Sequence, residues 1–335
     1  MSTENKTMVS MRSILKVIYA AEQSEGVGAR VRRSIGSMSM RNFTPFLMLD
    51  HFFVSPDAGF PDHPHRGQET VTYVMKNYML HEDFTGESGV LRPGDLQFMT
   101  AGKGICHSEM PYSEDGSKVE GMQLWVDLPK ELKHCEPRYR DLRAEEIPIV
   151  RPNDKVEVRV ISGKSYGVES VKELAYTPMD YYWFTVQPGG KFEQEIPEDY
   201  NAFLYILDGS LDLAGQKVEK FHTAFFKRDG SGLVGSVPEN ADVTNFVIIA
   251  GKALDQEIVQ YGPFVETNKA DIYQAFQDYQ SAQNGFERSR NWASEIGHGV
   301  DNGLFRTKSN DNLVGHGLPL EATNKKVVNF NKDEL

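Results

Sequence analysis

Four side chains that can bind a metal occur in two pairs with the same spacing. His63 and His65 are two residues apart in GFPDHPHRGQET (59–70), and His107 and Glu109 are two residues apart in GKGICHSEM (102–110). In an extended strand, residues i and i+2 point to the same face, so each pair can present both side chains to one ion. Two such pairs on neighbouring strands would bring four nitrogen and oxygen ligands together, which is the outline of a metal site.

The segments around these pairs look like short β-strands. Runs rich in β-branched and aromatic residues recur along the chain, separated by turn signals such as Pro93-Gly94-Asp95. This spacing is typical of an all-β sandwich or barrel. The runs are 70–75, 122–126, 156–161, 181–186, 203–207 and 243–250. One helix is predicted near the end, with Asn268 as its N-cap, Gly285 at its end, and one face formed by Ile272, Phe276 and Tyr279.

The strand runs fall into two sets, which predicts two domains in a chain of 335 residues. We place the first domain at 10–140, a charged linker with two prolines at 141–154, and the second domain with the helix at 155–298. The remaining segment, 299–335, is rich in Asn and Gly and has little periodicity, so it is predicted to be a largely disordered tail.

Composition narrows the classes of function. The chain has 36 Lys and Arg residues against 48 Asp and Glu residues, and the net charge of −12 disfavours direct binding to nucleic acid. Its two cysteines, Cys106 and Cys135, lack CxxC spacing, which favours a reducing compartment. Cys106 has the opposite parity to His107 and is expected in the core.

Targeting signals predict where the chain resides. No stretch approaches the roughly 18 apolar residues of a membrane span, and we see no secretory signal, so a soluble cytoplasmic or nuclear protein is expected. The last four residues, 332–335, spell the retrieval signal KDEL, which is read only inside the secretory pathway. Nothing at the N-terminus would deliver the chain there, so we expect this signal not to act.

Several motifs resemble the pirin family of the cupin superfamily. They are HPHRGxET from His63, TAGKGICHSEMP (100–111) and QLWVDLP (123–129), with further similarity at 25–36, 262–265 and 278–288. The similarity covers about residues 10–298. It implies two tandem cupin β-barrels with a short C-terminal helix and an irregular tail, and one Fe(II) in the N-terminal barrel. The ligands would be His63, His65, His107 and Glu109.

The resemblance leaves a choice between two carboxylates. The general cupin pattern places its carboxylate four residues after the second histidine, which is Glu69 here, with the parity to face inward. The pirin pattern uses the carboxylate beside the histidine of the second strand, which is Glu109 here. We favour Glu109 as the ligand and expect Glu69 to be a neighbour of the ligands or an alternative ligand. The second barrel has only the pair Glu193 and Glu195, which more often marks a solvated face, so no tight metal site is expected there.

The resemblance also implies an activity, the quercetin 2,3-dioxygenase reaction, in which O2 opens the ring of a flavonol and carbon monoxide is released. Glu109 is the candidate base for the 3-hydroxyl of the flavonol, because that oxygen must lose its proton before it can chelate well. An apolar mouth could be formed by Phe60, Phe98 and Met99, although such residues at strand spacing are more often core.

The alternative hypothesis is an iron-containing, redox-sensing transcriptional co-regulator, since members of the family that resemble this chain are described as contacting Rel-type transcription factors. A protein partner could dock on a basic patch within 28–41, formed by Arg30, Arg32, Arg33 and Arg41. A solvated edge strand guarded by charge explains the same arginines equally well. A monomer is expected, because a bicupin carries its pseudo-dimer within one chain.

Overall fold

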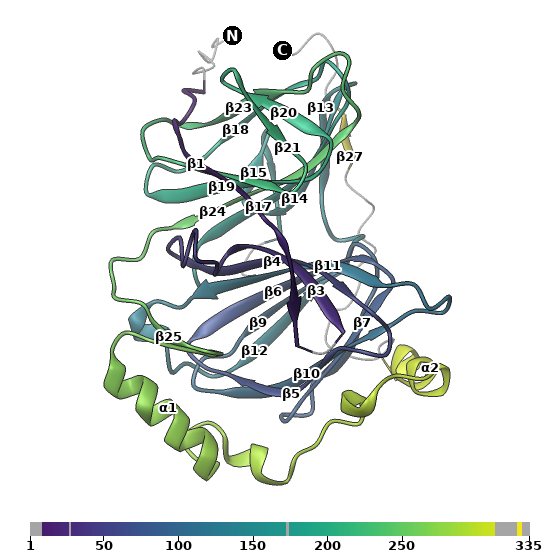
Figure 1. Ribbon diagram of the computed structural model, residues 1–335, viewed down its shortest axis with the longest axis vertical. Coiled ribbons are helices and arrows are strands. Elements are labelled where there is room, and N and C mark those ends of the chain that lie inside the picture. The colour runs from purple at the N-terminus through teal and green to yellow at the C-terminus, as the bar shows by residue number, and fades with distance from the viewer. Residues whose placement is uncertain (1–8, 27, 172–173, 312–326, 330–335) are drawn as a thin grey trace.

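The protein consists of two β-barrels stacked end to end, as a computed structural model shows for residues 9–26, 28–171, 174–311 and 327–329 (Figure 1). This arrangement confirms the predicted all-β class and its two tandem β-barrels. Every strand run expected from the sequence falls on a strand, with only residue 243 lying one position before its strand begins. These strands are β6 (Gln68–Lys76), β11 (Val119–Asp127), β14 (Val156–Ser162), β17 (Met179–Val186), β19 (Tyr200–Asp208) and β24 (Thr244–Lys252).

The first barrel is made of a large and a small antiparallel sheet. The large sheet has the order β12-β9-β6-β11-β4-β3-β2, and the small sheet has the order β5-β10-β7-β8. The remaining bounds are β2 (Glu22–Glu25), β3 (Ala29–Ile35), β4 (Phe46–Val54), β5 (Phe60–His65), β7 (Tyr78–Asp83), β8 (Ser88–Leu91), β9 (Leu96–Thr100), β10 (Ile105–Tyr112) and β12 (Arg138–Leu142).

The second barrel repeats this plan. Its sheets have the orders β1-β22-β19-β24-β17-β14-β13-β27 and β18-β23-β20-β21, so β18 and β23 hold the places of β5 and β10. The remaining bounds are β1 (Ile14–Tyr19), β13 (Ile149–Asn153), β18 (Lys191–Glu195), β20 (Ser210–Leu213), β21 (Gln216–Glu219), β22 (His222–Phe226), β23 (Gly232–Ser236) and β27 (Val327–Asn329).

The main hydrophobic core lies between the two large sheets. Phe46, Tyr73 and Phe98 of the first barrel pack in one cluster with Tyr181 and Phe203 of the second. A separate apolar cluster fills the inside of the second barrel. The strands of its large sheet are therefore buried on both faces, which explains why their sequences are almost continuously apolar. The inside of the first barrel holds a smaller apolar cluster together with polar side chains.

The structure corrects the predicted domain boundaries. β1 pairs with β22, with Val17 opposite Ala224, so the N-terminal segment joins the second barrel (Figure 1). The predicted linker, 141–154, contains the end of β12 and all of β13, each at or near the edge of a large sheet. An edge strand makes hydrogen bonds with whichever sheet offers a free edge, and sequence order does not identify that sheet.

The predicted helix is α1 (Lys269–Ser281), and it packs on the first barrel rather than the second. The Asn268 side chain caps it by accepting a hydrogen bond from the Asp271 amide at 2.9 Å, as expected. The helix ends at Ala282, in the left-handed conformation with φ of 50°, and not at Gly285. Ile272 of this helix shares a buried cluster with Cys106, which is core as predicted.

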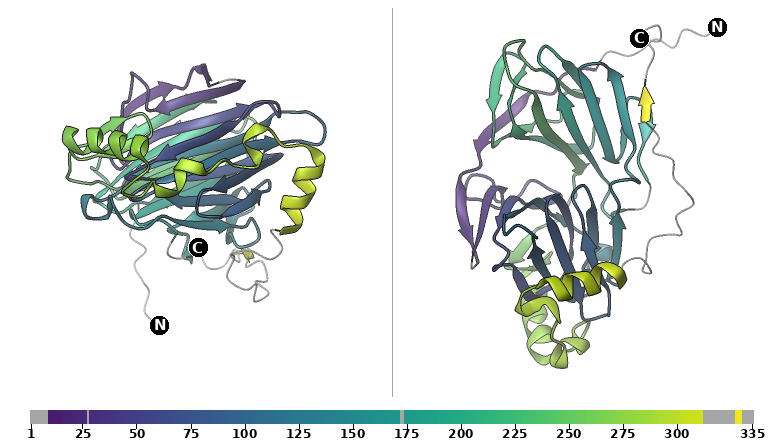
Figure 2. Two further views of the ribbon diagram at one scale, coloured as in Figure 1. Left: turned by 90° about the horizontal axis from the view of Figure 1, so that it is seen from below. Right: turned by 90° about the vertical axis from the view of Figure 1, so that its right-hand side faces the viewer.

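The tail prediction is wrong for the segment that forms α2 (Asn302–Asp311). The Phe305 ring stacks on Tyr112 with 3.9 Å between ring centroids, and Lys308 pairs with Glu82 and with Glu295. The reason is that α2 covers apolar residues of β7, β8 and β10 and so buries its own apolar side (Figure 2). The KDEL residues, 332–335, lie outside the described residues.

Neither α1 nor α2 is long and apolar enough to cross a membrane, and the same holds for every other helix in the described part of the chain.

Arg66 connects β5 to the C-terminal segment, and this link can be tested by mutation. Its guanidinium is fully buried and lies 2.7 Å from Asp278, which is also buried. Asp278→Ala should lower the free energy of unfolding by about 3–5 kcal/mol, because it leaves a buried charge unpaired. Denaturant titration followed by tryptophan fluorescence measures this loss. Glu136→Ala, which removes the exposed partner of Lys103, is the matched control and should change the free energy of unfolding little. Equal losses in the two variants would contradict the structural role given to the Arg66–Asp278 pair.

Candidate metal centre

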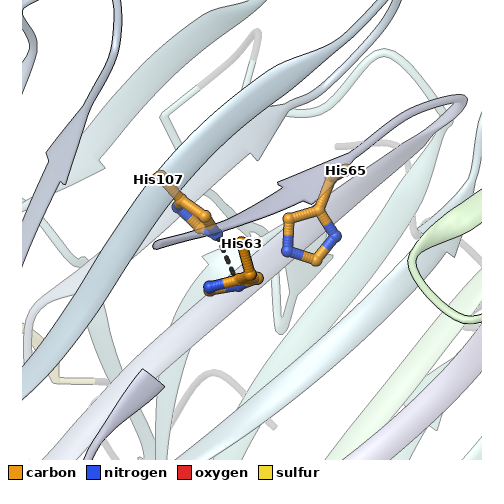
Figure 3. Close-up of side chains that lie close together, drawn as sticks. All are labelled: His63, His65 and His107. Atoms are coloured by element: carbon orange, nitrogen blue, oxygen red, sulfur yellow. Dashed lines mark hydrogen bonds between the residues drawn. The ribbon is translucent and has the colours of Figure 1, made fainter. Parts of the chain in front are cut away.

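The pairing of β5 with β10 brings three of the predicted ligands together inside the first barrel. His63 lies opposite His107 in the register, and His65 lies opposite Ile105. Candidate ligand atoms of His63, His65 and His107 all lie within 4.8 Å of one another, and Figure 3 shows the three rings converging. The i, i+2 argument from the sequence therefore holds for this strand.

The spacing of the imidazoles fits a transition metal. His63 Nε2 and His107 Nε2 are 3.0 Å apart. Two nitrogens bound at about 2.1 Å and at right angles on one metal are also about 3.0 Å apart. His65 Nε2 is buried and has no hydrogen-bond partner among the described residues, so it too is available for a ligand bond. A metal ion accounts for all three nitrogens.

Neighbouring groups orient two of these rings, and burial favours the neutral form of His65 and His107. His63 Nδ1 lies 2.9 Å from the Pro61 carbonyl, and donating a proton there leaves Nε2 with its lone pair. The Gln68 amide contacts His65 Nδ1 at 2.9 Å. Burial lowers the pKa of His65 and of His107 well below the ordinary value, and the charge of His63 lowers both further. Neutral imidazoles are the form that binds metals.

Glu109 lies beside the histidine cluster but is not part of it. Its Oε2 is 4.0 Å from His107 Nε2, which is within the roughly 4.2 Å between two ligands on opposite sides of one metal. Gln123 Nε2 donates to Oε2 at 3.2 Å, and Thr72 Oγ1 lies 3.0 Å from Oε1. Thr72 Oγ1 is also 2.7 Å from Gln123 Oε1, so its single proton serves one acceptor at a time. Sequence reasoning missed both of these residues.

Glu69 faces away from the histidines, so the inward orientation expected for it is wrong. Its carboxylate accepts hydrogen bonds from the Thr100 hydroxyl at 2.7 Å and from the amides of Tyr176 and Thr177 at 2.9 and 3.0 Å. The parity argument fails because Gly67, with φ of +75°, separates β5 from β6 and places them in different sheets. Burial raises the pKa of Glu69, although these hydrogen bonds oppose the shift.

A cavity of about 710 Å³ opens onto the histidines. His63, His65 and Glu109 line it together with an apolar wall formed by Val31, Leu47, Met48, Phe52, Phe60 and Met79. Phe60 therefore takes the predicted place at the mouth. Phe98 and Met99 do not, since Phe98 lies in the core between the barrels and Met99 packs with the buried cluster beneath α1. The volume is in the usual range for a small-molecule site.

The basic patch predicted from the sequence is largely neutralised. Arg30 and Arg32 both pair with Glu22, at 2.8 and 3.3 Å. Arg33 pairs with Glu25 at 2.8 Å and with Asp50 at 2.6 Å. These acids lie on β2 and β4, which flank β3 in the sheet. The stretch 28–41 contains none of them, so the sequence of that stretch alone did not reveal the pairing. Arg41 is exposed at the rim of the cavity.

In the second barrel, the strand that holds the place of β5 has no imidazole at its buried positions. The buried positions of β18 are Phe192 and Gln194, and Phe192 packs against Phe246 with 4.8 Å between ring centroids. Phe184 stacks on the same Phe246 ring at 5.1 Å. Among the described residues, the one cluster of three or more metal-binding side chains is that of His63, His65 and His107.

Comparison with known proteins identifies the family. The family model described as Pirin matches residues 28–126, and the one described as Pirin C-terminal cupin domain matches residues 181–285. The human protein named Pirin is 46% identical over 299 residues, which cover 87% of this chain and all of that protein. The chain belongs to the pirin family, within the cupin superfamily. This pirin is also 39% identical, over 81% of its length and 98% of the relative, to a Pseudomonas aeruginosa protein provisionally named quercetin 2,3-dioxygenase.

Solved structures agree with this family. A quercetin 2,3-dioxygenase from Acinetobacter baumannii superposes with a TM-score of 0.75 at 28% identity, covering 82% of this pirin and 98% of that chain. A bacterial pirin from Escherichia coli in complex with nickel(II) superposes with a TM-score of 0.56, covering 71% of this pirin and 99% of that chain. At 18% identity, the second comparison shows the shared fold alone.

Removing one histidine should abolish tight metal binding. In His107→Ala, two imidazoles remain and the affinity for a divalent transition metal should fall at least about 100-fold. Competition with a chromophoric chelator measures the affinity. His222→Ala changes a histidine of the second barrel and should bind metal like the wild type. Unchanged affinity in His107→Ala would show that the cluster is not the metal site.

Metal stoichiometry tests the difference between the barrels. Elemental analysis of the purified, metal-loaded protein should give one equivalent per chain, because aromatic rings occupy the inside of the second barrel. Changing Glu193 and Glu195 to Gln should leave that value unchanged. Two equivalents, with the second lost in this double variant, would show that the second barrel also holds a metal.

Proposed function

We propose that this protein is an iron-dependent dioxygenase of the quercetin 2,3-dioxygenase type. The observation that carries the proposal is the cluster of three imidazoles, with a carboxylate beside it, on the wall of a cavity of about 710 Å³ that has one apolar side. Three imidazoles and one carboxylate leave two positions of an octahedral ion open, which suits a chelating substrate or a substrate and O2. The similarity to two proteins that bear the name of this enzyme supports the choice of reaction.

The residues that would hold Fe(II) are His63, His65, His107 and Glu109. When bound, the ion would supply positive charge that favours the substrate as an oxyanion and would allow the electron-rich substrate and O2 to meet. The pirin from E. coli was solved with nickel(II), so the fold does not determine which metal is bound. Iron is therefore part of this proposal.

Glu109 would take the proton of the flavonol 3-hydroxyl. Its carboxylate lies next to His107, and it lines the cavity that the substrate would enter. Gln123 holds one of its oxygens and Thr72 contacts the other, so the carboxylate is oriented before the substrate arrives. When Glu109 accepts a proton, the Thr72 hydroxyl can turn to Gln123, whose Oε1 is 2.7 Å away. This exchange of one hydrogen bond would accommodate both protonation states.

The apolar wall would bind the flat ring system and keep bulk water from the reacting atoms. Val31, Phe52 and Phe60 belong to this wall. Trp125 also lines the cavity, perpendicular to the ring of His65 with 5.2 Å between centroids. A substrate that chelates at the histidines would therefore lie between the indole and the apolar wall.

Turnover by the Glu109→Gln variant tests the assignment of the base. Protein loaded anaerobically with Fe(II) is mixed with quercetin and then with air, and loss of the flavonol absorbance is followed. Glu109→Gln should keep most of its iron but lose at least about 100-fold in kcat, because an amide cannot accept the proton. Glu25→Gln changes a carboxylate at the rim of the same cavity and is the control. Full turnover by iron-loaded Glu109→Gln would overturn the assignment of Glu109 as the base. No turnover of quercetin by the iron-loaded wild type would overturn the proposed reaction.

A further inference from the structure

The second barrel has a cavity of its own at the place that corresponds to the metal cavity. Its volume is about 1160 Å³, and residues of β14, β17 and β18 line it. In the first barrel, the strands at the same places in the sheet order are β3, β4 and β5, and these line the metal cavity. The second barrel therefore has a cavity at this place although its β18 carries no pair of histidines.

The described lining of this second cavity is strongly acidic. It contains five carboxylates and one lysine, and Lys164 lies 3.9 Å from one of those carboxylates, that of Glu169. The metal cavity, in contrast, has three carboxylates and two arginines in its lining. The five acids are Glu169, Asp180, Glu193, Glu195 and Glu198. Such a lining attracts a cation and repels the flavonol anion that suits the first cavity.

Asp180 is the acid of this lining whose pKa burial shifts. It is partly buried, and in the part of the chain that the structure describes no lysine or arginine lies within 4.0 Å of its carboxylate. Burial raises the pKa of Asp180 to about 6, while a hydrogen bond from Tyr182 opposes the shift. A side chain at Gly163 would come within 2.3 Å of Asp180 Oδ1, so the glycine leaves room for this carboxylate.

Gln194 adds a buried acceptor without a donor. Its Nε2 donates to the carbonyls of Lys164 and Glu195 at 3.0 and 2.9 Å, while its Oε1 has no partner among the described residues and the residue is 2% exposed. Rotating the amide by 180° would set Oε1 against both carbonyls, so the unsatisfied atom is the acceptor. Such an atom costs free energy unless an N–H or O–H reaches it. The Tyr182 hydroxyl meets the same Lys164 carbonyl, at 3.0 Å, which places Gln194 near Asp180.

We propose that this cavity binds a small protonated amine, whose ammonium group pairs with Asp180 and satisfies Gln194 Oε1 directly or through one bound water. The carboxylate supplies the charge, and the orphaned acceptor requires a donor, which a quaternary ammonium group lacks. Three tyrosines in the lining, Tyr166, Tyr182 and Tyr200, provide aromatic surface for the rest of the ligand. The site is independent of the metal and of the proposed dioxygenase reaction.

A matched pair of probes tests the proposal on the full-length protein. Tyramine and tyrosol share one phenol ring and one two-carbon chain, and they differ in having an ammonium or a hydroxyl group at its end. In titrations followed by saturation-transfer NMR, the wild type should bind tyramine at least about tenfold more tightly than tyrosol. Equal binding of the two probes, or no binding of tyramine at millimolar concentration, would overturn the proposal.

Variants locate the binding. Asp180→Asn should remove the preference for tyramine, whereas Asp208→Asn, in which the acid is an exposed partner of Lys220 on the same barrel, should retain it. If near-ultraviolet circular dichroism shows that Asp180→Asn is not folded, Gln194→Leu takes its place, with weaker tyramine binding expected. A crystal structure with tyramine should place its nitrogen beside Asp180. A full preference for tyramine in the folded variant, or a crystal in which no tyramine nitrogen lies beside Asp180, would overturn the proposal.

Discussion

The buried guanidinium of Arg66 fixes the strand that carries His63 and His65 relative to the rest of the molecule. It donates to the Lys103 carbonyl at 2.6 Å, just before β10, to Asp278 of α1 at 2.7 Å and to the Asn284 carbonyl at 2.5 Å. A planar group with several donors can meet these three partners at once. The positions of β5, of the start of β10 and of the C-terminal segment therefore depend on one side chain.

This link explains why a segment beyond the second barrel contributes to the metal centre. After β24 the chain returns to the first barrel, where Gly262 and Pro263 line the metal cavity and α1 packs beneath it (Figure 1). The N-terminal strand β1 makes the opposite exchange and completes the second barrel. The N-terminal segment therefore completes the second barrel, and the C-terminal segment completes the first. This exchange makes the two barrels one structural unit.

The two barrels divide stability and chemistry between them. The second barrel has an apolar interior, and the large sheets of both barrels share an apolar core. The interior of the first barrel can therefore carry polar side chains such as Thr72, Gln123 and Glu109, which hold one another by hydrogen bonds. Buried polar groups are tolerated when they are paired in this way.

The sequence predicted what depends on local periodicity and missed what depends on long-range pairing. The two-residue spacing of His63 and His65 was sufficient because β5 is one uninterrupted strand. The orientation of Glu69 was wrong because a turn at Gly67 intervenes, and the pairing of three of the patch arginines was missed because their acids lie on other strands. Thr72 and Gln123 carried a weak signal, as polar residues within otherwise apolar strand runs, but only the sheet order brings them to Glu109.

The central claim is that the three imidazoles and Glu109 hold one iron ion, and a crystal structure of the iron-loaded protein with anomalous diffraction at the iron edge tests it most directly. The account predicts one anomalous peak in the first barrel, bonded to Nε2 of His63, His65 and His107 and to an oxygen of Glu109. A peak at another place, or a peak on the histidines with Glu109 still 4.0 Å from His107 and with another group bound in its stead, would contradict it.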